Sequence, residues 1–402
     1  CTWDFTAHPA SILYVDGERP GHDCTVGRPA AVRRLSELAA VAKPTAGDAN
    51  DLPLRPVLFA GTGVGPIGDI IQGQLGTCYL LGAMGAVVSR DPDAVKSLFV
   101  NYDVDVGVYG VRFNVDGEWR CVIVDDIVPV DKCGEILYAR SSMPQEIWCS
   151  VLEKAFCKLH TCYEMCDGGQ ASEAVFALFG GVSGKLKILP CHHEDPRRYF
   201  RILRHAHSNG WLLTTDFGVV SEVTAANGYV EANGKCGDAV LPLGLISGHT
   251  YSILRVVEAH GHQLVCLRNP WGNGEWAGRW SALNTDGEWT KEMVDATGFG
   301  PGVNGSFWMS TEDLVQHSSG VEFARSFGPE WKKVTQYAHF RQGTLLATAK
   351  TDYSANDEHE ISFSAGDQIE VTSQSGSFWW RGRVWCVRLP GQAERRKGFF
   401  PA

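Results

Sequence analysis

The sequence contains no stretch that approaches the ~20 consecutive apolar residues needed to span a membrane. Its longest apolar run, residues 79–88, has the length of a buried helix. Basic residues are also in the minority, because 36 Lys and Arg stand against 46 Asp and Glu, for a net charge of −10. This balance argues against nucleic acid or an anionic membrane surface as the main partner. We therefore expect a protein without a membrane span and without a nucleic-acid partner.

Motifs for structural metal sites and for a disulfide framework are missing as well. No two cysteines are spaced as CxxC and no two histidines as HxxxH, so a zinc site is not indicated. The 13 cysteines are odd in number and irregularly spaced, in a chain of 402 residues that is much larger than disulfide-stapled modules. We expect reduced thiols in an intracellular, cytoplasmic protein. No signal peptide is present, and because the chain begins with Cys1 we expect a fragment.

The sequence does contain enough apolar residues, 44%, for packed cores in more than one domain. Residues 1–50 form an irregular segment rich in turn signals, with one short helix expected at 30–41. Residues 51–197 are helix-rich and residues 198–335 are mostly strands. Residues 345–402 show short strands separated by turn residues. The predicted fold class is α+β, with a helical lobe, a β-rich lobe and a small all-β barrel.

Cys78 stands between a glycine-rich turn and an apolar segment, a pattern typical of a helix that begins at the cysteine. The partial positive charge of a helix N-terminus favours thiolate over thiol and lowers the cysteine pKa. His249 and Asn269 follow on strand-like runs, and Gln72 precedes Cys78 by six residues. Cys, His and Asn in this order, preceded by Gln, are the parts of a papain-like cysteine protease site. The pattern predicts a cleft to which the helical lobe supplies Cys78 and the β-rich lobe supplies His249 and Asn269.

The sequence blocks around these residues resemble the calpain family of cysteine proteases, between about residues 55 and 325. The resemblance implies a papain-like two-lobed core that hydrolyses peptide bonds in protein substrates, without an organic cofactor. Further matching blocks are Val122-Ile-Val-Asp-Asp, Glu146-Ile-Trp-Cys-Ser-Val-Leu-Glu-Lys-Ala, Gly168-Gly, Phe179-Gly-Gly-Val182, Asn269-Pro-Trp-Gly-Asn-Gly-Glu-Trp276 and Phe307-Trp-Met-Ser310.

The same resemblance assigns a role to each site residue. Cys78 would attack the substrate carbonyl as a thiolate, and His249 would protonate the leaving amine. Asn269 would orient the imidazole through its side-chain oxygen. Gln72 and the backbone N–H of Cys78 would stabilise the oxyanion. Trp271 would shield the Asn–His hydrogen bond from water and obstruct the substrate cleft until the lobes close.

Two residues beside the nucleophile depart from the family pattern. Calpains usually have Asp and Trp on either side of the cysteine, where this sequence has Thr77 and Tyr79. Thr77 removes no catalytic group, whereas Tyr79 keeps an aromatic ring but changes the packing under the nucleophile. Two alternatives therefore stay open. One is a catalytically weak or inactive calpain-like adaptor or scaffold protein; the other is a transglutaminase, which normally has Asp where Asn269 stands.

The resemblance also implies calcium binding, because calpain cores close when each lobe binds the ion. Asp69 and Glu146 match the carboxylate ligands of the helical lobe, and loop 61–65 would add carbonyl oxygens. Calcium takes roughly six to eight oxygen ligands, which this set and water can supply. In the β-rich lobe only Glu275 matches, since the other acidic positions read Ala282, Asn304 and Ser306. We expect one calcium site in the helical lobe and at most a weak second site; alternatively, Glu146 simply begins a helix.

Residues 345–402 resemble a Src-homology 3 (SH3) domain. Tyr353 belongs to its alanine-leucine-tyrosine-aspartate-tyrosine motif, Trp379 begins the tryptophan pair and Pro401 belongs to the final motif. Such domains hold polyproline II ligands between aromatic rings. The chain ends before the last groove tyrosine, so we expect a truncated domain that binds proline-rich peptides weakly through these three residues. The alternative is a β-barrel that merely packs on the protease.

Overall fold

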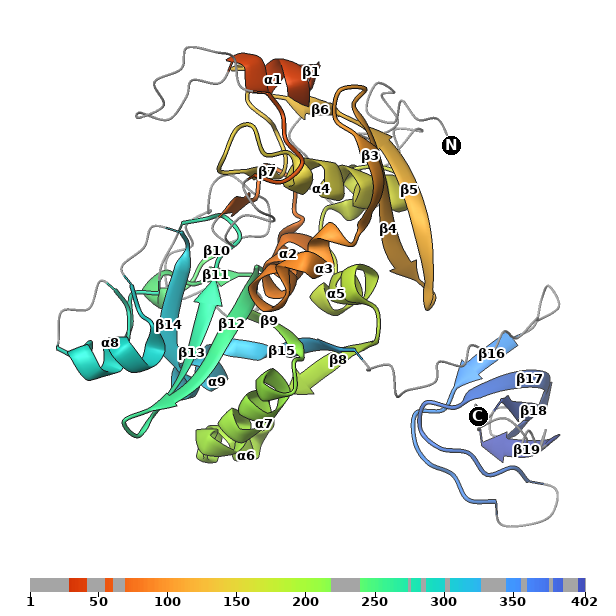
Figure 1. The fold of residues 1–402 in the computed structure, drawn as a ribbon. Coiled ribbons are helices and arrows are strands. Elements are labelled where there is room, and N and C mark those ends of the chain that lie inside the picture. Colours follow the sequence, from red (N-terminus) through yellow and green to blue (C-terminus); the bar gives the residue numbers. More distant parts are fainter. Residues whose placement is uncertain are drawn as a thin grey trace. The chain divides into compact units, whose positions relative to one another are not determined.

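The chain folds into two compact units, Cys1–Trp331 and Lys332–Ala402 (Figure 1). Within the described residues, no helix is long and apolar enough to cross a membrane. Helices and antiparallel sheets are both present, which confirms the α+β class. The computed structural model describes residues 29–41, 55–60, 69–217, 239–273, 276–282, 287–300, 304–326, 345–355, 360–375, 379–385 and 397–401.

In the described residues of the helical lobe, helices pack against a small sheet around one hydrophobic core. Helix α2 (Cys78–Arg90) runs through its middle, and the apolar run from Tyr79 to Val88 is buried, as its length predicted. The other helices are α3 (Pro92–Lys96), α4 (Trp148–Leu159) and α5 (Ala171–Phe179), with a 3-10 turn η4 (Glu164–Cys166); the strands are β3 (Phe99–Asp103), β4 (Val108–Val115) and β5 (Glu118–Asp125) in the order β3-β4-β5, and the short pair β2 (Ile70–Ile71) and β7 (Arg140–Ser141).

A buried ion pair joins α4 to the end of β5. The Lys154 ammonium contacts Asp125 and donates a hydrogen bond to the Ile127 carbonyl at 2.6 Å. The exposed fractions of the two charged side chains are 0% and 2%. Burial lowers the pKa of Lys154 to about 8, and the neighbouring Asp125 carboxylate opposes this shift. The pair therefore fixes how the long helix sits on the sheet.

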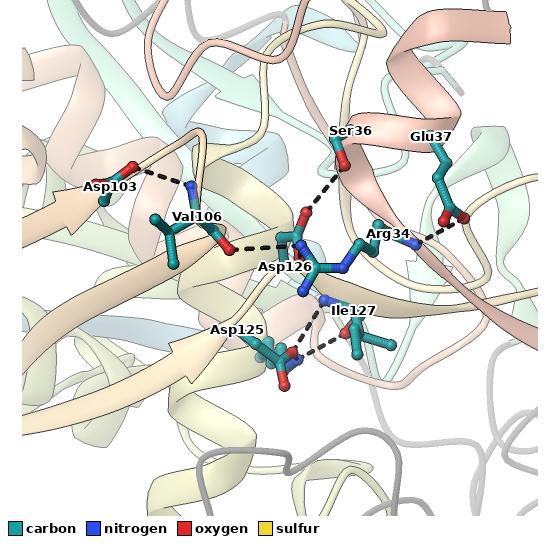
Figure 2. A network of polar contacts seen from close by, with 9 residues as sticks. Arg34, Ser36, Glu37, Asp103, Val106, Asp125, Asp126 and Ile127 are labelled. Atoms are coloured by element: carbon teal, nitrogen blue, oxygen red, sulfur yellow. Dashed lines mark hydrogen bonds and ion pairs between the residues drawn. The ribbon is translucent and has the colours of Figure 1, made fainter.

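The N-terminal segment lies along this lobe. Strand β1 (Ala31–Arg34) pairs with β6 (Ile127–Val130) before α1 (Leu35–Val41) begins. The helix expected at 30–41 is therefore wrong in its first part, because pairing with β6 outweighs local helix propensity. Arg34 Nη1 lies 3.5 Å from Asp126 Oδ1, and Ser36 donates to Asp126 Oδ2 (Figure 2). Burial raises the pKa of Asp126, and the Arg34 guanidinium partly opposes this.

The β-rich lobe has its own core, between a mostly antiparallel sheet, in which β11 and β9 pair in parallel, and the helices α6, α7 and α9. Its strand order is β10-β11-β9-β12-β13-β14, and β15 pairs with both β8 and β9. Strand β8 lies before the domain boundary expected at residue 198, so the sheet takes one strand from the preceding segment. The elements are β8 (Val182–Lys187), α6 (Pro190–Glu194), α7 (Pro196–Ser208), β9 (Leu212–Phe217), β10 (Ala239–Val240), the 3-10 turn η6 (Pro242–Gly244), β11 (Ile246–Ser247), β12 (Thr250–Ala259), β13 (His262–Arg268), α8 (Lys291–Thr297), β14 (Ser306–Ser310), α9 (Thr311–His317) and β15 (Ser318–Arg325).

The hairpin β12–β13 sets the position of two predicted site residues. Its turn residues His260 and Gly261 have φ angles of 46° and 83°, the left-handed conformation that tight hairpins require. At the other end of the hairpin, Ser252 pairs with Arg268. His249 precedes β12 and Asn269 follows β13. The antiparallel register therefore brings these two residues to the same end of the sheet.

The smaller unit is one antiparallel sheet in the order β16-β17-β18-β19. Its small core contains Ala349, Ile361, Ile369 and Val371. This arrangement agrees with the all-β pattern of the sequence. The strands are β16 (Leu345–Thr348), β17 (Gln368–Ser375), β18 (Trp379–Trp385) and β19 (Lys397–Pro401).

Candidate active site

Cys78 is the first residue of α2, which confirms the predicted start of the helix, and it is partly exposed. Thr77 occupies the N-cap position, but its side chain makes no capping hydrogen bond. Its hydroxyl donates instead to Glu153 Oε1 at 2.5 Å, and Glu153 Oε2 accepts from the backbone N–H of Ala139 at 2.8 Å. Because the Thr77 hydroxyl bonds to Glu153, the start of α2 beside the Cys78 thiol receives no capping hydrogen bond from Thr77.

A second contact supports the turn that leads into Cys78. The N–H of Gly76 donates to Asp167 Oδ1 at 2.7 Å, and the N–H of Gly168 donates to the Gly76 carbonyl at 2.9 Å. Gly169 packs on the Tyr79 ring so closely that a β-carbon there would lie 2.6 Å from the ring. Segment 167–169 therefore contacts the residues on both sides of the nucleophile.

His249 and Asn269 are both buried, and His249 Nε2 lies 2.8 Å from Asn269 Oδ1. The same oxygen accepts the backbone N–H of Trp271 at 3.0 Å. Because a backbone N–H only donates, Asn269 must present its oxygen here, and His249 Nε2 must carry the hydrogen. In the neutral ring Nδ1 is then the basic nitrogen, which suits a proton acceptor for a thiol.

Aromatic rings enclose the imidazole. The Trp271 ring lies 4.6 Å from that of His249 between centroids, and the Tyr251 ring meets it edge-on at 5.2 Å. Trp271 thus packs on the His249 imidazole, whose hydrogen bond to Asn269 it is predicted to shield from water.

Direct contacts join the Cys78 helix to the His249 strand. Ser252 donates to the Gly82 carbonyl at 2.7 Å, and a β-carbon on Gly82 would lie 2.9 Å from the Thr250 methyl group. Gly82 lies about one helical turn beyond Cys78, and Thr250 follows His249. The packing of α2 on β12 thus brings the two predicted reacting residues to the same region (Figure 1).

Gln72 is buried at the boundary between the two lobes. Its side-chain N–H donates to the Leu75 carbonyl at 2.8 Å, and its backbone N–H donates to the Pro270 carbonyl at 3.0 Å. A primary amide has two hydrogens, so the second remains available for an oxyanion. Gln72 and Asn269 therefore lie on two chain segments that are hydrogen-bonded to each other.

Comparison with known proteins agrees with this arrangement. The model for "Calpain family cysteine protease" matches residues 4–325, and that for "SH3 domain" matches residues 348–402. The chain belongs to the calpain family. It also carries an SH3 domain, so both resemblances of the sequence are confirmed.

Several calpains align with a large part of this chain. "Calpain-type cysteine protease DEK1" of Zea mays is 33% identical over 283 residues, 69% of this chain and 12% of that protein. "Calpain-2 catalytic subunit" of Homo sapiens is 28% identical over 331 residues, 77% of this chain and 44% of that protein. "Calpain-5" of Mus musculus is 31% identical over 281 residues, 63% of this chain and 42% of that protein. The chain thus matches less than half the length of each relative.

The predicted calcium ligands of this calpain lie close to the catalytic segment. Asp69 is buried; its Oδ1 accepts from the Ser142 hydroxyl at 2.5 Å, while its Oδ2 has no hydrogen-bond partner among the described residues. Glu146 is also buried, and it accepts from the Ala60 N–H at 2.9 Å and from Ser141 at 2.7 Å. An unpartnered buried carboxylate oxygen fits a cation ligand.

Other parts of the calcium prediction fall outside what the structure describes. Loop 61–65 and Glu275 are not among the described residues. Among those that are, no group of three or more His, Cys, Asp or Glu side chains is arranged to hold a metal. A calcium site at Asp69 and Glu146 would therefore rely on carbonyl and water oxygens for most of its ligands.

In the SH3 domain, Tyr353 packs on Phe363 at 5.4 Å between ring centroids, and its hydroxyl donates to Glu360 at 2.6 Å. Trp379 of β18 pairs with Pro401 of β19 in the strand register. Two of the three predicted groove residues are therefore neighbours in the sheet.

Sequence reasoning did not find Glu153, Asp167 or Arg268. Glu153 lies within Trp148–Cys157, ten consecutive buried residues of α4, and no local pattern distinguishes its contact with Thr77. Asp167 acts through a loop that is distant in sequence from Gly76. Arg268 did leave a signal, because it is a charged residue at the end of the apolar run Leu264-Val-Cys-Leu and directly precedes Asn269.

Proposed function

We propose that this calpain is an intracellular cysteine endopeptidase that hydrolyses peptide bonds through Cys78, His249 and Asn269, and that calcium modulates it. The observation that carries the proposal is the pair of hydrogen bonds to Asn269 Oδ1, which places the hydrogen of His249 on Nε2. The basic nitrogen is then Nδ1, on the residue directly before a strand that packs against the helix of Cys78. The nine cysteines among the described residues are all free thiols, which supports a reducing setting.

In the first half of the reaction, His249 Nδ1 accepts the thiol proton, and the Cys78 thiolate attacks the substrate carbonyl carbon. The helix N-terminus favours the thiolate. The resulting oxyanion receives hydrogen bonds from the Cys78 N–H and from the second amide hydrogen of Gln72. His249 then protonates the amine, which leaves, and a thioester remains on Cys78.

In the second half, His249 takes a proton from water, and the hydroxide so formed attacks the thioester carbonyl. The tetrahedral intermediate expels the Cys78 thiolate and releases the carboxylate product. Throughout, Asn269 keeps the imidazole in one orientation and one tautomer, and it stabilises the imidazolium through its oxygen. The Trp271 ring excludes water from this hydrogen bond.

Cleavage of unfolded casein tests the proposal, with Cys78→Ala and His249→Ala as inactive variants. A cysteine-directed epoxysuccinyl reagent should label Cys78, and Cys121→Ala serves as the control because Cys121 is exposed and lies outside the site. We expect cleavage and labelling to disappear in Cys78→Ala and to persist in Cys121→Ala. A folded sample with neither activity would favour the adaptor or scaffold alternative, and amine incorporation into glutamine would favour a transglutaminase.

The calcium part of the proposal is supported by the unpartnered Asp69 oxygen and by Glu146 beside it along the Ser141–Ser142 segment. A bound ion would neutralise these buried carboxylates and take carbonyl oxygens of loop 61–65 as further ligands. Titration calorimetry with calcium chloride should show one site in the native chain. Asp69→Asn should weaken it, whereas Asp93→Asn, at an exposed aspartate of α3, should not. Two tight sites, or none, would contradict the one-site proposal.

For the SH3 domain we propose weak binding of proline-rich peptides through Tyr353, Trp379 and Pro401. The pairing of Trp379 with Pro401 supports it, since such ligands lie between aromatic rings. This module would bring substrates or partners to the protease.

A further inference from the structure

Arg268 is a fully buried arginine at the last position of β13, next to Asn269. Its Nε donates to the Asn304 carbonyl at 3.1 Å, within the β-rich lobe. Its Nη2 donates to the Ile70 carbonyl at 2.7 Å, in the helical lobe. One side chain thus reaches from the strand that ends just before Asn269 into the other half of the site.

A backbone hydrogen bond runs parallel to this contact. The N–H of Gln72 donates to the Pro270 carbonyl at 3.0 Å. Ile70 and Gln72, on either side of Ile71, are therefore bonded to Arg268 and Pro270, on either side of Asn269. We call the hydrogen bond from Arg268 to Ile70 and the one from Gln72 to Pro270 together the Arg268 seam. Gly272 continues the contact, because a β-carbon there would lie 3.7 Å from the Ile71 side chain.

The chemistry of arginine suits this position. Its planar guanidinium holds several donors in a fixed arrangement, so one group can bond two carbonyls in different directions. A lysine ammonium on a flexible stem cannot reproduce that geometry. Burial lowers the pKa of Arg268 to about 10, so the group stays cationic at neutral pH. A buried cation depends strongly on its hydrogen-bond acceptors, and one of these belongs to the helical lobe.

We infer that Arg268 is a positioning residue that holds the Gln72 segment against the Asn269 loop and so aligns the oxyanion-binding half of the site with the imidazole half. The inference deepens the proposed function, since alignment matters for catalysis only if the site is catalytic. Misplacement of reacting groups by ~1 Å can cost a rate on the order of 100-fold.

Hydrogen exchange of the folded full chain tests the seam without any need for activity. In the native protein the Gln72 amide should be protected. Arg268→Lys should accelerate exchange at residues 69–75 by about tenfold or more, because the seam opens locally. Arg255→Lys is the matched control: Arg255 lies on neighbouring β12 and donates to the Thr297 carbonyl within its own lobe. An unprotected Gln72 amide in the native chain, or equal exchange in both variants, would overturn the inference.

The consequence for the site is measured by the rate at which the epoxysuccinyl reagent labels Cys78, as a function of pH. Arg268→Lys should slow labelling on the order of 100-fold and move the pH profile, whereas Arg255→Lys should leave both unchanged. If Arg268→Lys loses thermal stability but changes neither the exchange at residues 69–75 nor the labelling profile, Arg268 has only a structural role. An unlabelled Cys78 in the native chain would contradict the proposed function, and the exchange result would then decide the seam by itself.

Discussion

At the scale of single residues, Thr77 shows how one side chain affects the nucleophile next to it. An N-cap threonine normally bonds to an N–H of the first helical turn. Here its hydroxyl goes to the buried Glu153 carboxylate, which also holds the Ala139 N–H. The first turn of α2 therefore receives no capping hydrogen bond from the Thr77 side chain. Thr77, which departs from the family pattern beside the nucleophile, thus has a hydrogen-bond partner in Glu153.

The Thr77–Glu153 contact predicts a difference between two substitutions. Thr77→Val removes the hydroxyl and leaves a buried carboxylate oxygen without its donor, so the free energy of unfolding should fall by about 1–3 kcal/mol. Thr77→Ser keeps the hydroxyl and should cost less. Urea denaturation of the protease unit measures both. Equal losses in the two variants would show that the hydrogen bond contributes no more to stability than the methyl group at this position.

At the scale of elements, helices are fixed on sheets by few but specific polar contacts. Helix α4 meets β5 through the buried pair Lys154–Asp125, and helix α2 meets β12 through Ser252 and Gly82. The apolar surfaces around these contacts provide most of the stabilisation. The polar contacts select one alignment among those that the apolar surfaces would allow.

The ion pair between α4 and β5 predicts strong non-additivity. Lys154→Met leaves the Asp125 charge buried without its ammonium, and the free energy of unfolding should fall by about 3–5 kcal/mol. The double variant Lys154→Met/Asp125→Asn removes both charges while keeping an oxygen for the Ile127 N–H, so its loss should be smaller than that of Lys154→Met alone. Chemical denaturation of the four proteins of this cycle measures the coupling. Additive losses would mean that the pair contributes no specific interaction.

At the scale of the whole molecule, the chain consists of two units with separate cores. The protease unit is large, whereas the SH3 unit spans 71 residues and the described part of its core contains Ala349, Ile361, Ile369 and Val371. Small domains bury a smaller share of their surface and are marginally stable. The two units should therefore differ in stability.

This division predicts two unfolding transitions in calorimetry of the full chain, with the SH3 domain unfolding first. A PxxP peptide at about 100 times its dissociation constant should stabilise the SH3 transition by about 2.7 kcal/mol and leave the protease transition unchanged. A charge-matched peptide without proline is the control. One cooperative transition, or a shift of both transitions by the peptide, would show that the units do not unfold independently.

Much of this protein follows from its sequence alone. The apolar run after Cys78 determines a buried helix, and the alternating strands with turn residues determine an α+β class and a small all-β unit. Local periodicity is sufficient for these features, because each follows from the spacing of apolar residues. The order of Cys, His and Asn indicates the site, and the family is confirmed. The roles of the individual residues stay predictions until the proposed experiments are done.

Only the tertiary structure decided which polar groups meet. Strand pairing with β6 converted part of an expected helix into β1, and the partners of Thr77, Gly76 and Arg268 lie 76, 91 and 198 residues away in sequence. A sequence pattern carries information over one helical turn or one strand. Contacts such as the Arg268 seam arise when separate elements are packed together, and the acceptor at Ile70 is a backbone carbonyl that no residue type encodes.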